Sequence, residues 1–186
     1  MAVRIKAKWH NEDVERSLDE IAGALAFIAW RLAADKAITL HGEDFVYESD
    51  RQRVDVIVEY LIYELALIDR IARDRLGLTE EDRRALVLGL ARRLAEHVQD
   101  NSQDLFGPGD YVAPFIARMN ARGGDYAALG FNDEGPTYPF LRHLGWEIQQ
   151  VMGREGDNRW VIDQVMDRDG YDVYRQIDKA IGNLFG

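Results

Sequence analysis

The chain has 186 residues, 47% of them hydrophobic, a composition that supports one folded domain with a substantial core. It contains no cysteine, which excludes disulfides, thiolate zinc sites and cysteine nucleophiles. The formal net charge is −10, from 33 acidic and 23 basic residues, so no nucleic-acid partner is expected. No apolar run reaches the roughly 20 residues that a bilayer requires, and the N-terminus lacks the pattern of a secretion signal. We therefore expect a cytoplasmic protein without a membrane span.

Residues 3–9 alternate bulky and basic side chains with the period of two that is typical of a β-strand. Residues 45–47 follow a turn-forming stretch and are rich in strand formers, so they are the expected partner. If the two segments do not pair, the first is expected to pair with another subunit, because unpaired strand edges recruit neighbours. The pattern predicts a minor two-stranded N-terminal β element, within the chain or between subunits.

Two long helices are predicted by matching apolar ladders with steps of four and three residues. The first helix is expected over residues 12–37 and the second from Ser49, an N-cap with Gln52 at capping-box spacing, to Gly77. Their ladders are Val14, Leu18, Ile21, Leu25, Ile28 and Leu32, and Val54, Val58, Leu61, Leu65, Ile68 and Ala72. Each stripe needs an apolar partner, so we expect the two helices to form a long antiparallel hairpin.

A third helix is expected over residues 79–99, capped by Thr79 and joined to the second by a tight turn at Gly77. All four prolines and most glycines follow residue 106, which favours shorter helices near residues 111–121, 138–152, 159–167 and 171–184. Residues 167–170 are interpreted as a turn between the last two. The predicted class is all-α: one domain, 1–186, with a long-helix core over 1–104 and a loop-rich helical part over 105–186.

The first helix is apolar on a second side, which carries Trp30 and small neighbours such as Ala26 and Ala33. A helix that is apolar on two sides lies either at the centre of its domain or in an oligomer interface. We expect a homodimer in which this second side or the N-terminal strand forms the contact, with a further protein partner as an open alternative.

Polar residues at predicted core positions are the other candidates for a functional site. Glu64 falls on the apolar side of the second helix and His97 on the apolar stripe of the third, so they are hypothesised to face each other as a tuned acid and base or as metal ligands. The competing interpretation is a structural hydrogen bond in the core. No Glu-x-x-His spacing is present, which argues against a di-iron bundle.

His143 and Glu147 share one helix face at i,i+4 spacing, as two metal ligands or as an ordinary ion pair. They belong to a larger set expected to line a cleft between the long helices and the C-terminal part. The other members are Asp110, Tyr111, Arg118, Asn120, Tyr138, Arg159, Trp160 and Asp163. The competing interpretation pairs Arg159 with Asp163 and buries Trp160 in the core.

The sequence therefore predicts an interaction or assembly protein without catalysis and without a cofactor. The alternative is a small-ligand-binding protein or a metal-dependent enzyme. Its ligand-binding candidates are Glu64, His97, His143, Glu147, Arg159 and Trp160.

Overall fold

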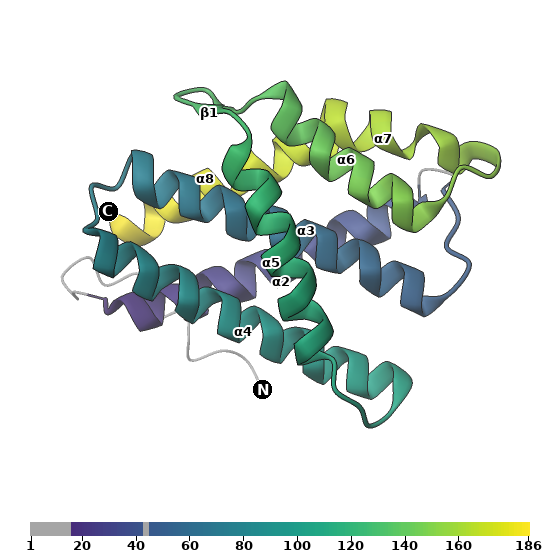
Figure 1. Cartoon of the computed structure of the whole chain (residues 1–186), viewed down its shortest axis with the longest axis horizontal. Helices are drawn as coiled ribbons and strands as arrows, with labels where there is room; N and C mark the ends of the chain where they lie inside the picture. The colour runs from purple at the N-terminus through teal and green to yellow at the C-terminus, as the bar shows by residue number, and fades with distance from the viewer. Residues whose placement is uncertain (1–15, 43–44) are drawn as a thin grey trace.

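The computed structural model describes residues 16–42 and 45–186, and this part of the chain is all-α with one small β-hairpin (Figure 1). The long helices are α2 (Leu18–Gly42), α3 (Asp50–Asp74) and α4 (Glu80–Phe106), followed by α5 (Val112–Ala128) and α6 (Tyr138–Met152). Strands β1 (Phe131–Asn132) and β2 (Gly135–Pro136) lie between α5 and α6. The chain ends with η1 (Gly156–Trp160), α7 (Val161–Gln164), η2 (Val165–Asp169) and α8 (Gly170–Phe185).

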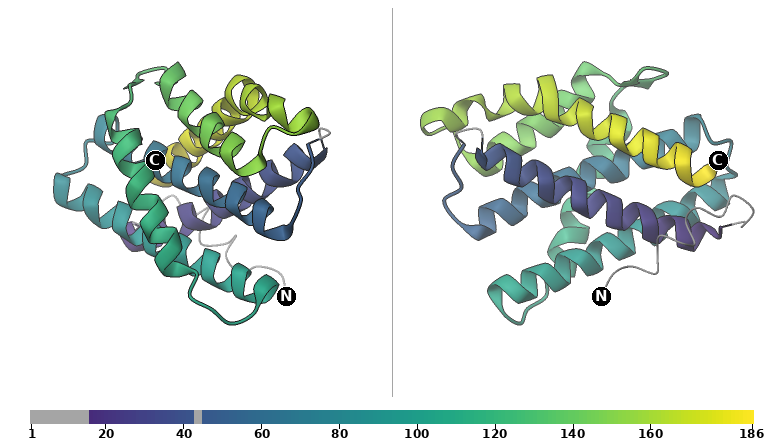
Figure 2. Two further views of the ribbon diagram at one scale, coloured as in Figure 1. Left: turned by 45° about the vertical axis from the view of Figure 1, so that its right-hand side comes forward. Right: turned by 180° about the vertical axis from the view of Figure 1, so that it is seen from behind.

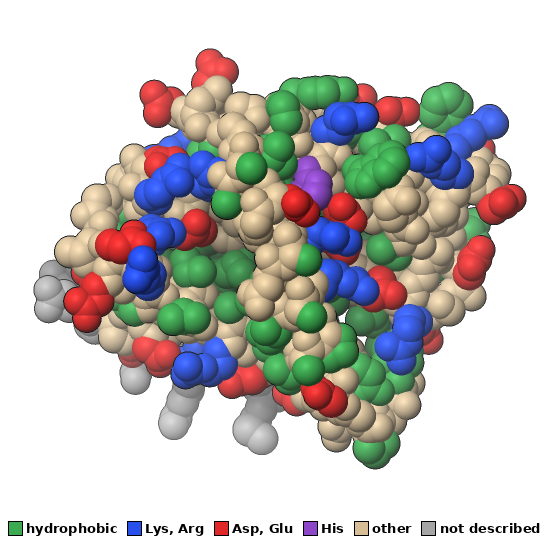
Figure 3. All heavy atoms as spheres, in the orientation of Figure 1, with side chains coloured by type: hydrophobic (Ala, Val, Ile, Leu, Met, Phe, Trp, Pro, Cys, Tyr) green, Lys and Arg blue, Asp and Glu red, His purple; other side chains and the backbone are tan. Residues whose placement is uncertain are grey.

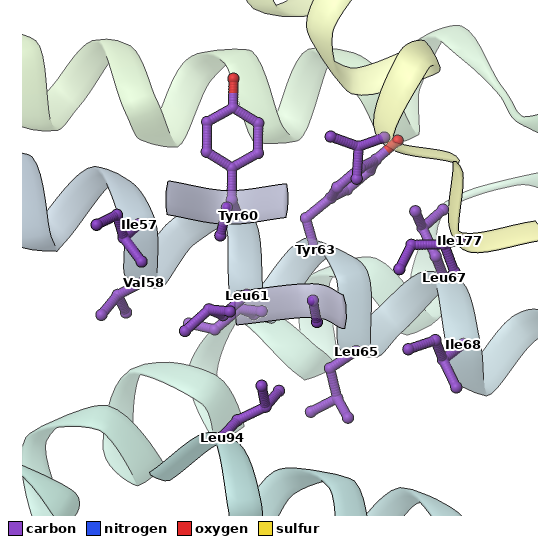
Figure 4. Close-up of a cluster of buried hydrophobic side chains, with 14 of the residues drawn as sticks. Ile57, Val58, Tyr60, Leu61, Tyr63, Leu65, Leu67, Ile68, Leu94 and Ile177 are labelled. Atoms are coloured by element: carbon purple, nitrogen blue, oxygen red, sulfur yellow. The ribbon is translucent and has the colours of Figure 1, made fainter. Parts of the chain in front are cut away.

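Helix α3 is the centre of the bundle and packs against α2, α4, α5, α6 and α8. Its ladder residues Leu61 and Leu65 point toward Leu94 of α4, whereas Tyr60 and Tyr63 point to the opposite side (Figure 4). Tyr63 is fully buried, and its hydroxyl donates a 2.8 Å hydrogen bond to the carbonyl of Gly170 at the start of α8. A helix that is apolar nearly all round can be stable only when neighbours cover every side, as they do here.

The predicted packing of the first two long helices against each other is confirmed, and residues of both ladders are buried. Leu25 of α2 and Leu61 of α3 are fully buried, and Leu65 is 8% exposed. Ser49 caps α3 by accepting a hydrogen bond from the Gln52 amide, and Thr79 caps α4 by accepting one from the Asp82 amide. Between these helices Gly77 has a φ of 61°, a left-handed conformation that glycine adopts without strain.

The second apolar side of α2 packs inside the chain, against α4. The small residues Ala22, Ala26 and Ala33 are fully buried, and a β-carbon at Gly89 of α4 would lie 3.2 Å from that of Ala22. Trp30 stacks on His97 of α4, with ring centroids 5.7 Å apart. The expectation that another subunit covers the small residues of this side is therefore wrong, because small side chains let α4 approach closely enough to cover them. Trp30 is only half-buried, and Phe27 of the same side is 56% exposed.

Three predicted helix ends are wrong because local signals were weak there. Helix α2 continues to Gly42 and α4 to Phe106, where Gly107 with a φ of 86° ends it. Helix α5 runs past the expected end, through Gly123 and Gly124, to Ala128.

The expected turn at residues 167–170 is also wrong: the chain stays helical from Gly156 to Phe185 and passes through one π-helical turn at η2. Gly170 is needed here for close packing, not for a turn. A β-carbon on it would lie 2.9 Å from the Leu141 side chain and 3.1 Å from the Val165 carbonyl.

The β element lies elsewhere than expected. Strands β1 and β2 pair antiparallel, with Phe131 opposite Pro136. Residues 45–47 form no strand, and the predicted strand at residues 3–9 lies outside the described residues. Among the described helices, none is both long and apolar enough to span a membrane.

Candidate functional site

Helix α5 crosses the surface of α3 between α4 and α6 and separates two different environments (Figure 1). On its α6 side lies an ionic cluster built from three helices. On its α4 side lies a cavity with a largely apolar floor. In the space-filling view a histidine lies beside acidic and basic side chains on one side of α5, and hydrophobic side chains line a hollow on the other (Figure 3).

Arg122 of α5 is at the centre of the ionic cluster. Its Nη2 lies 2.5 Å from Oε2 of Glu147 on α6, and its Nε donates a 3.4 Å hydrogen bond to Oε2 of Glu59 on α3. Glu59 is only 2% exposed, and burial raises its pKa even though Arg122 and Arg118 lower it. One guanidinium thus bridges two buried carboxylates and ties α5 to two neighbouring helices.

Arg118, one turn earlier on α5, extends this cluster toward the surface. Its Nη1 lies 3.0 Å from Oδ1 of Asp55 and 3.7 Å from Oε1 of Glu59. The Nη1 atom is buried, but the angles at the short contact do not give a hydrogen bond. The interaction with Asp55 is therefore mainly Coulombic.

His143 of α6 completes the cluster. Its Nδ1 lies 3.9 Å from Oε1 of Glu147, and its Nε2 lies 3.6 Å from Oδ2 of Asp125. Burial lowers the pKa of this imidazole despite the two acids, so the neutral form is favoured at neutral pH. The buried Nε2 has no hydrogen-bond partner among the described residues. This arrangement offers a neutral imidazole that can accept or donate a proton.

The ionic cluster does not by itself make a metal site. Among the residues that the structure describes, no three histidine, aspartate or glutamate side chains are placed to share one ion. The arginines already occupy the space between the carboxylates, and a cation there would have to displace Arg122. The arrangement is best suited to holding α5 and α6 in register.

Arg70 of α3 holds the other end of α5. Its Nη2 donates hydrogen bonds of 2.9, 2.8 and 2.8 Å to the carbonyls of Tyr126, Ala127 and Leu129. These carbonyls lie at the end of the helix, where the backbone supplies fewer donors. A cation at that end also complements the helix dipole. Arg70 therefore acts as a C-terminal cap supplied by another helix.

The cavity on the opposite side of α5 has a volume of about 300 Å³. Helix α3 forms its floor, α4 one wall and α5 the other. The lining residues are Ile62, Leu65, Ala66, Asp69, Arg70, Val87, Met119, Asn120, Gly123, Tyr126 and Ala127. Its size is at the lower end of the range for small-molecule sites.

The structure brings together Arg118, His143 and Glu147 among the candidates named from the sequence. Asn120 lies apart from them, on the cavity. Near the start of α5, Asp110 accepts a hydrogen bond from the Ala113 amide, and the Tyr111 hydroxyl donates to the Gly107 carbonyl, so both have structural roles.

The other candidates lie on exposed surface away from both features. Trp160 is 53% exposed, against the expectation of a core residue, and the Arg159 guanidinium lies 5.1 Å from its ring. Both belong to η1, which follows the far end of α6 from His143. Tyr138 and Asp163 are exposed as well.

The hypothesised pairing of Glu64 with His97 is wrong. His97 stacks on Trp30, whereas both carboxyl oxygens of Glu64 are buried without a hydrogen-bond partner among the described residues. Complete burial raises the pKa of Glu64 well above its ordinary value and so favours the protonated form of the carboxyl. Helical periodicity located Glu64 correctly on a buried face and His97 on a half-buried one, but it could not fix the rotation of α3 relative to α4.

Glu59, Arg122 and Asp125 are the site residues that sequence reasoning missed. One signal was available: i,i+4 pairs of like charge occur at Asp55 with Glu59 and at Arg118 with Arg122. Such pairs destabilise an isolated helix, so opposite charges on neighbouring helices should have been expected.

A second feature is the outward face of α2, which lies at the surface between α4 and α8 (Figure 2). Phe27 is 56% exposed and Ile38 is 65% exposed. The exposed charged residues Arg31 and Asp35 lie between them. These four residues are called the α2 stripe below.

Comparisons with models of protein families, with curated proteins and with solved structures returned no match.

Proposed function

We propose that the protein functions by assembly, as a homodimer formed through the α2 stripe. The supporting observation is the self-complementary order of the stripe: an apolar residue at each end, with a basic and an acidic residue between them. Phe27 and Ile38 are eleven residues apart, three helical turns, and so lie on nearly the same line along α2. Large apolar side chains repeated along one exposed line favour contact with another protein surface.

A second copy of the chain fits this stripe better than an arbitrary partner. In an antiparallel two-fold pairing centred between Leu32 and Ala33, Phe27 lies opposite Ile38 of the partner subunit. The same pairing brings Arg31 close to Asp35 of the partner subunit. In a two-fold interface, if one residue contacts a second residue of the partner subunit, the second also contacts the first across the axis. The order of these residues along α2 allows such reciprocal contacts. Since a single helix pair buries limited area, we expect a dissociation constant on the order of micromolar.

Sedimentation equilibrium of the full chain over a range of concentrations tests the proposal. Ile38→Glu is expected to shift the protein to monomer, because a carboxylate would be buried against Phe27 of the partner subunit. Leu88→Glu is the matched control, since Leu88 is also 65% exposed but lies on α4 outside the α2 stripe. A monomeric wild type at high concentration, or equal effects of the two variants, would contradict the proposal.

Exchanging the charges adds an independent test. Arg31→Asp alone places two acids together in the dimer and is expected to weaken association. Adding Asp35→Arg restores complementary charge and is expected to recover association. Failure of the double variant to recover would exclude the antiparallel pairing described above.

A further inference from the structure

The cavity between α3, α4 and α5 lies on a different face from the α2 stripe and is not explained by assembly. Its floor and walls consist mainly of apolar side chains, including Ile62, Leu65, Val87 and Met119. Its volume of about 300 Å³ leaves room for a small organic molecule. Solvent can reach this apolar cavity. Binding of an apolar molecule that displaces water from it is therefore favourable.

The charged groups at the cavity are already compensated within the protein. Asp69 forms an ion pair with Arg83, which also binds Glu80. The Nη2 of Arg70 is committed to three carbonyls at the end of α5. Because both charged side chains of the lining already have partners within the protein, the cavity favours an uncharged occupant.

Asn120 supplies an uncharged amide side chain to the cavity. It lines the cavity and is exposed, which places it near the mouth. Its side-chain amide forms no hydrogen bond with any residue that the structure describes, and it can both donate and accept. A ligand with a single hydrogen-bonding group beside an apolar body would therefore be complementary to this lining.

The glycine pair in α5 supports the same conclusion. Neither Gly123 nor Gly124 has a positive φ, and a β-carbon on either would meet no atom within 4 Å outside the backbone of its own helix. Each glycine nevertheless weakens the helix relative to alanine. Packing does not require them, but Gly123 lines the cavity, where the missing side chain keeps the cavity open and lets a ligand approach the backbone.

We propose that this cavity binds a small, uncharged, mainly apolar molecule that carries one hydrogen-bonding group, with Asn120 as its polar contact. The apolar body would lie against Leu65, Val87 and Met119. Gly123 would allow it to contact the backbone of α5.

Fluorescence titration of the full chain with N-phenyl-1-naphthylamine tests the proposal. This probe is uncharged and apolar, carries one N–H, and fluoresces more strongly in apolar surroundings. We expect saturable binding, with amide chemical-shift changes confined to the cavity residues Ala66, Val87 and Met119. The absence of saturable binding, or shifts located elsewhere, would overturn the proposal.

Two matched variants locate the site. Gly123→Leu fills the cavity and is expected to lower the affinity at least about tenfold. Gly124→Leu is expected to leave the affinity unchanged, because Gly124 does not line the cavity. Both substitutions replace glycine with a better helix former, so folding is retained and circular dichroism can verify it. Equal effects of the two variants would overturn the proposal.

Asn120→Ala is expected to lower the affinity about three- to tenfold, the effect of one hydrogen bond. An unchanged affinity would exclude the proposed polar contact. If Gly123→Leu instead shifts the monomer–dimer equilibrium and leaves probe binding intact, the occupant is a second copy of the chain and the ligand proposal is wrong. The α2 variant Ile38→Glu separates the two proposals, because it is expected to abolish dimers and to leave probe binding unchanged.

Discussion

Helix α3 has two unlike neighbourhoods. Toward α2 and α4 it meets buried leucines, and the alanines of α2 let α2 and α4 approach each other closely. Toward α5 it meets ion pairs, a glycine pair and a cavity. Dense apolar packing resists deformation, whereas α5, with its glycine pair and with only Phe115 and Tyr126 buried, has less packing to hold it closed. We therefore expect α2 and α4 to form a rigid platform and α5 to form an adaptable layer.

The largest expected effect is in the rigid platform. Leu25→Ala, at a fully buried position, should lower the free energy of unfolding by about 3 kcal/mol through lost burial and a residual cavity. Urea denaturation at low protein concentration measures it. Phe27→Ala on the same helix should change monomer stability by less than about 0.5 kcal/mol, because Phe27 is 56% exposed. Similar losses in both variants would show that α2 is not packed as described.

A smaller effect with a different salt dependence is expected at α5. Arg122→Met leaves Glu59 and Glu147 without their shared counterion and should lower stability by about 2 kcal/mol, since Arg122 is itself partly exposed. Added salt screens the repulsion between Glu59 and Glu147 in the variant, so the difference in stability between wild type and variant should become smaller at high salt. Arg142→Met, at an exposed position of α6, is the control and should have little effect. If the two arginine variants behave alike, the ionic cluster does not hold α5.

Sequence reasoning was successful where local chemistry decides structure. The caps Ser49 and Thr79, the turn at Gly77 and the bounds of α6 all follow from residue type and spacing. The contacts around α5 depend on residues far apart in the chain. Arg70 is 56 residues from Tyr126, and Arg122 is 63 from Glu59, so only the packing of three helices brings them together. Of the candidate site, the sequence therefore supplied Arg118, His143 and Glu147 without the residues that bind them.

The pH dependence of the unfolding free energy tests whether Glu64 of α3 is buried in the core. Burial raises the pKa of its carboxyl well above the ordinary 4.5, so the folded protein takes up a proton that the unfolded chain releases. The contribution of Glu64 to the free energy of unfolding is fully present below about pH 4.5. It falls by about 1.4 kcal/mol per pH unit as the pH rises toward the folded-state pKa. Glu64→Gln and Glu64→Leu should both remove this slope. Unfolding free energies that run parallel for wild type and variants between about pH 5 and about pH 7 would contradict this assignment.

The smallest predicted effect contrasts two glycines directly. Gly124→Ala in α5 should raise stability by about 1 kcal/mol, because the added methyl meets no atom within 4 Å outside its own helix backbone. Gly89→Ala in α4 should gain less or lose stability, because its methyl would lie 3.2 Å from the β-carbon of Ala22 and press α4 away from α2. Thermal unfolding of both variants measures the difference. Equal gains in stability for the two variants would contradict the difference in packing between the two neighbourhoods of α3.

Native-state hydrogen exchange of the full chain, resolved by residue, tests this distinction most directly. We predict that amides of α5 around Gly123 and Gly124 exchange through local opening, whereas the buried amides of α2, α3 and α4 exchange only through global unfolding. Saturation with N-phenyl-1-naphthylamine should slow exchange in α5 and leave α2 unchanged. Protection of α5 equal to that of α3, without probe, would contradict the division into a rigid platform and an adaptable layer.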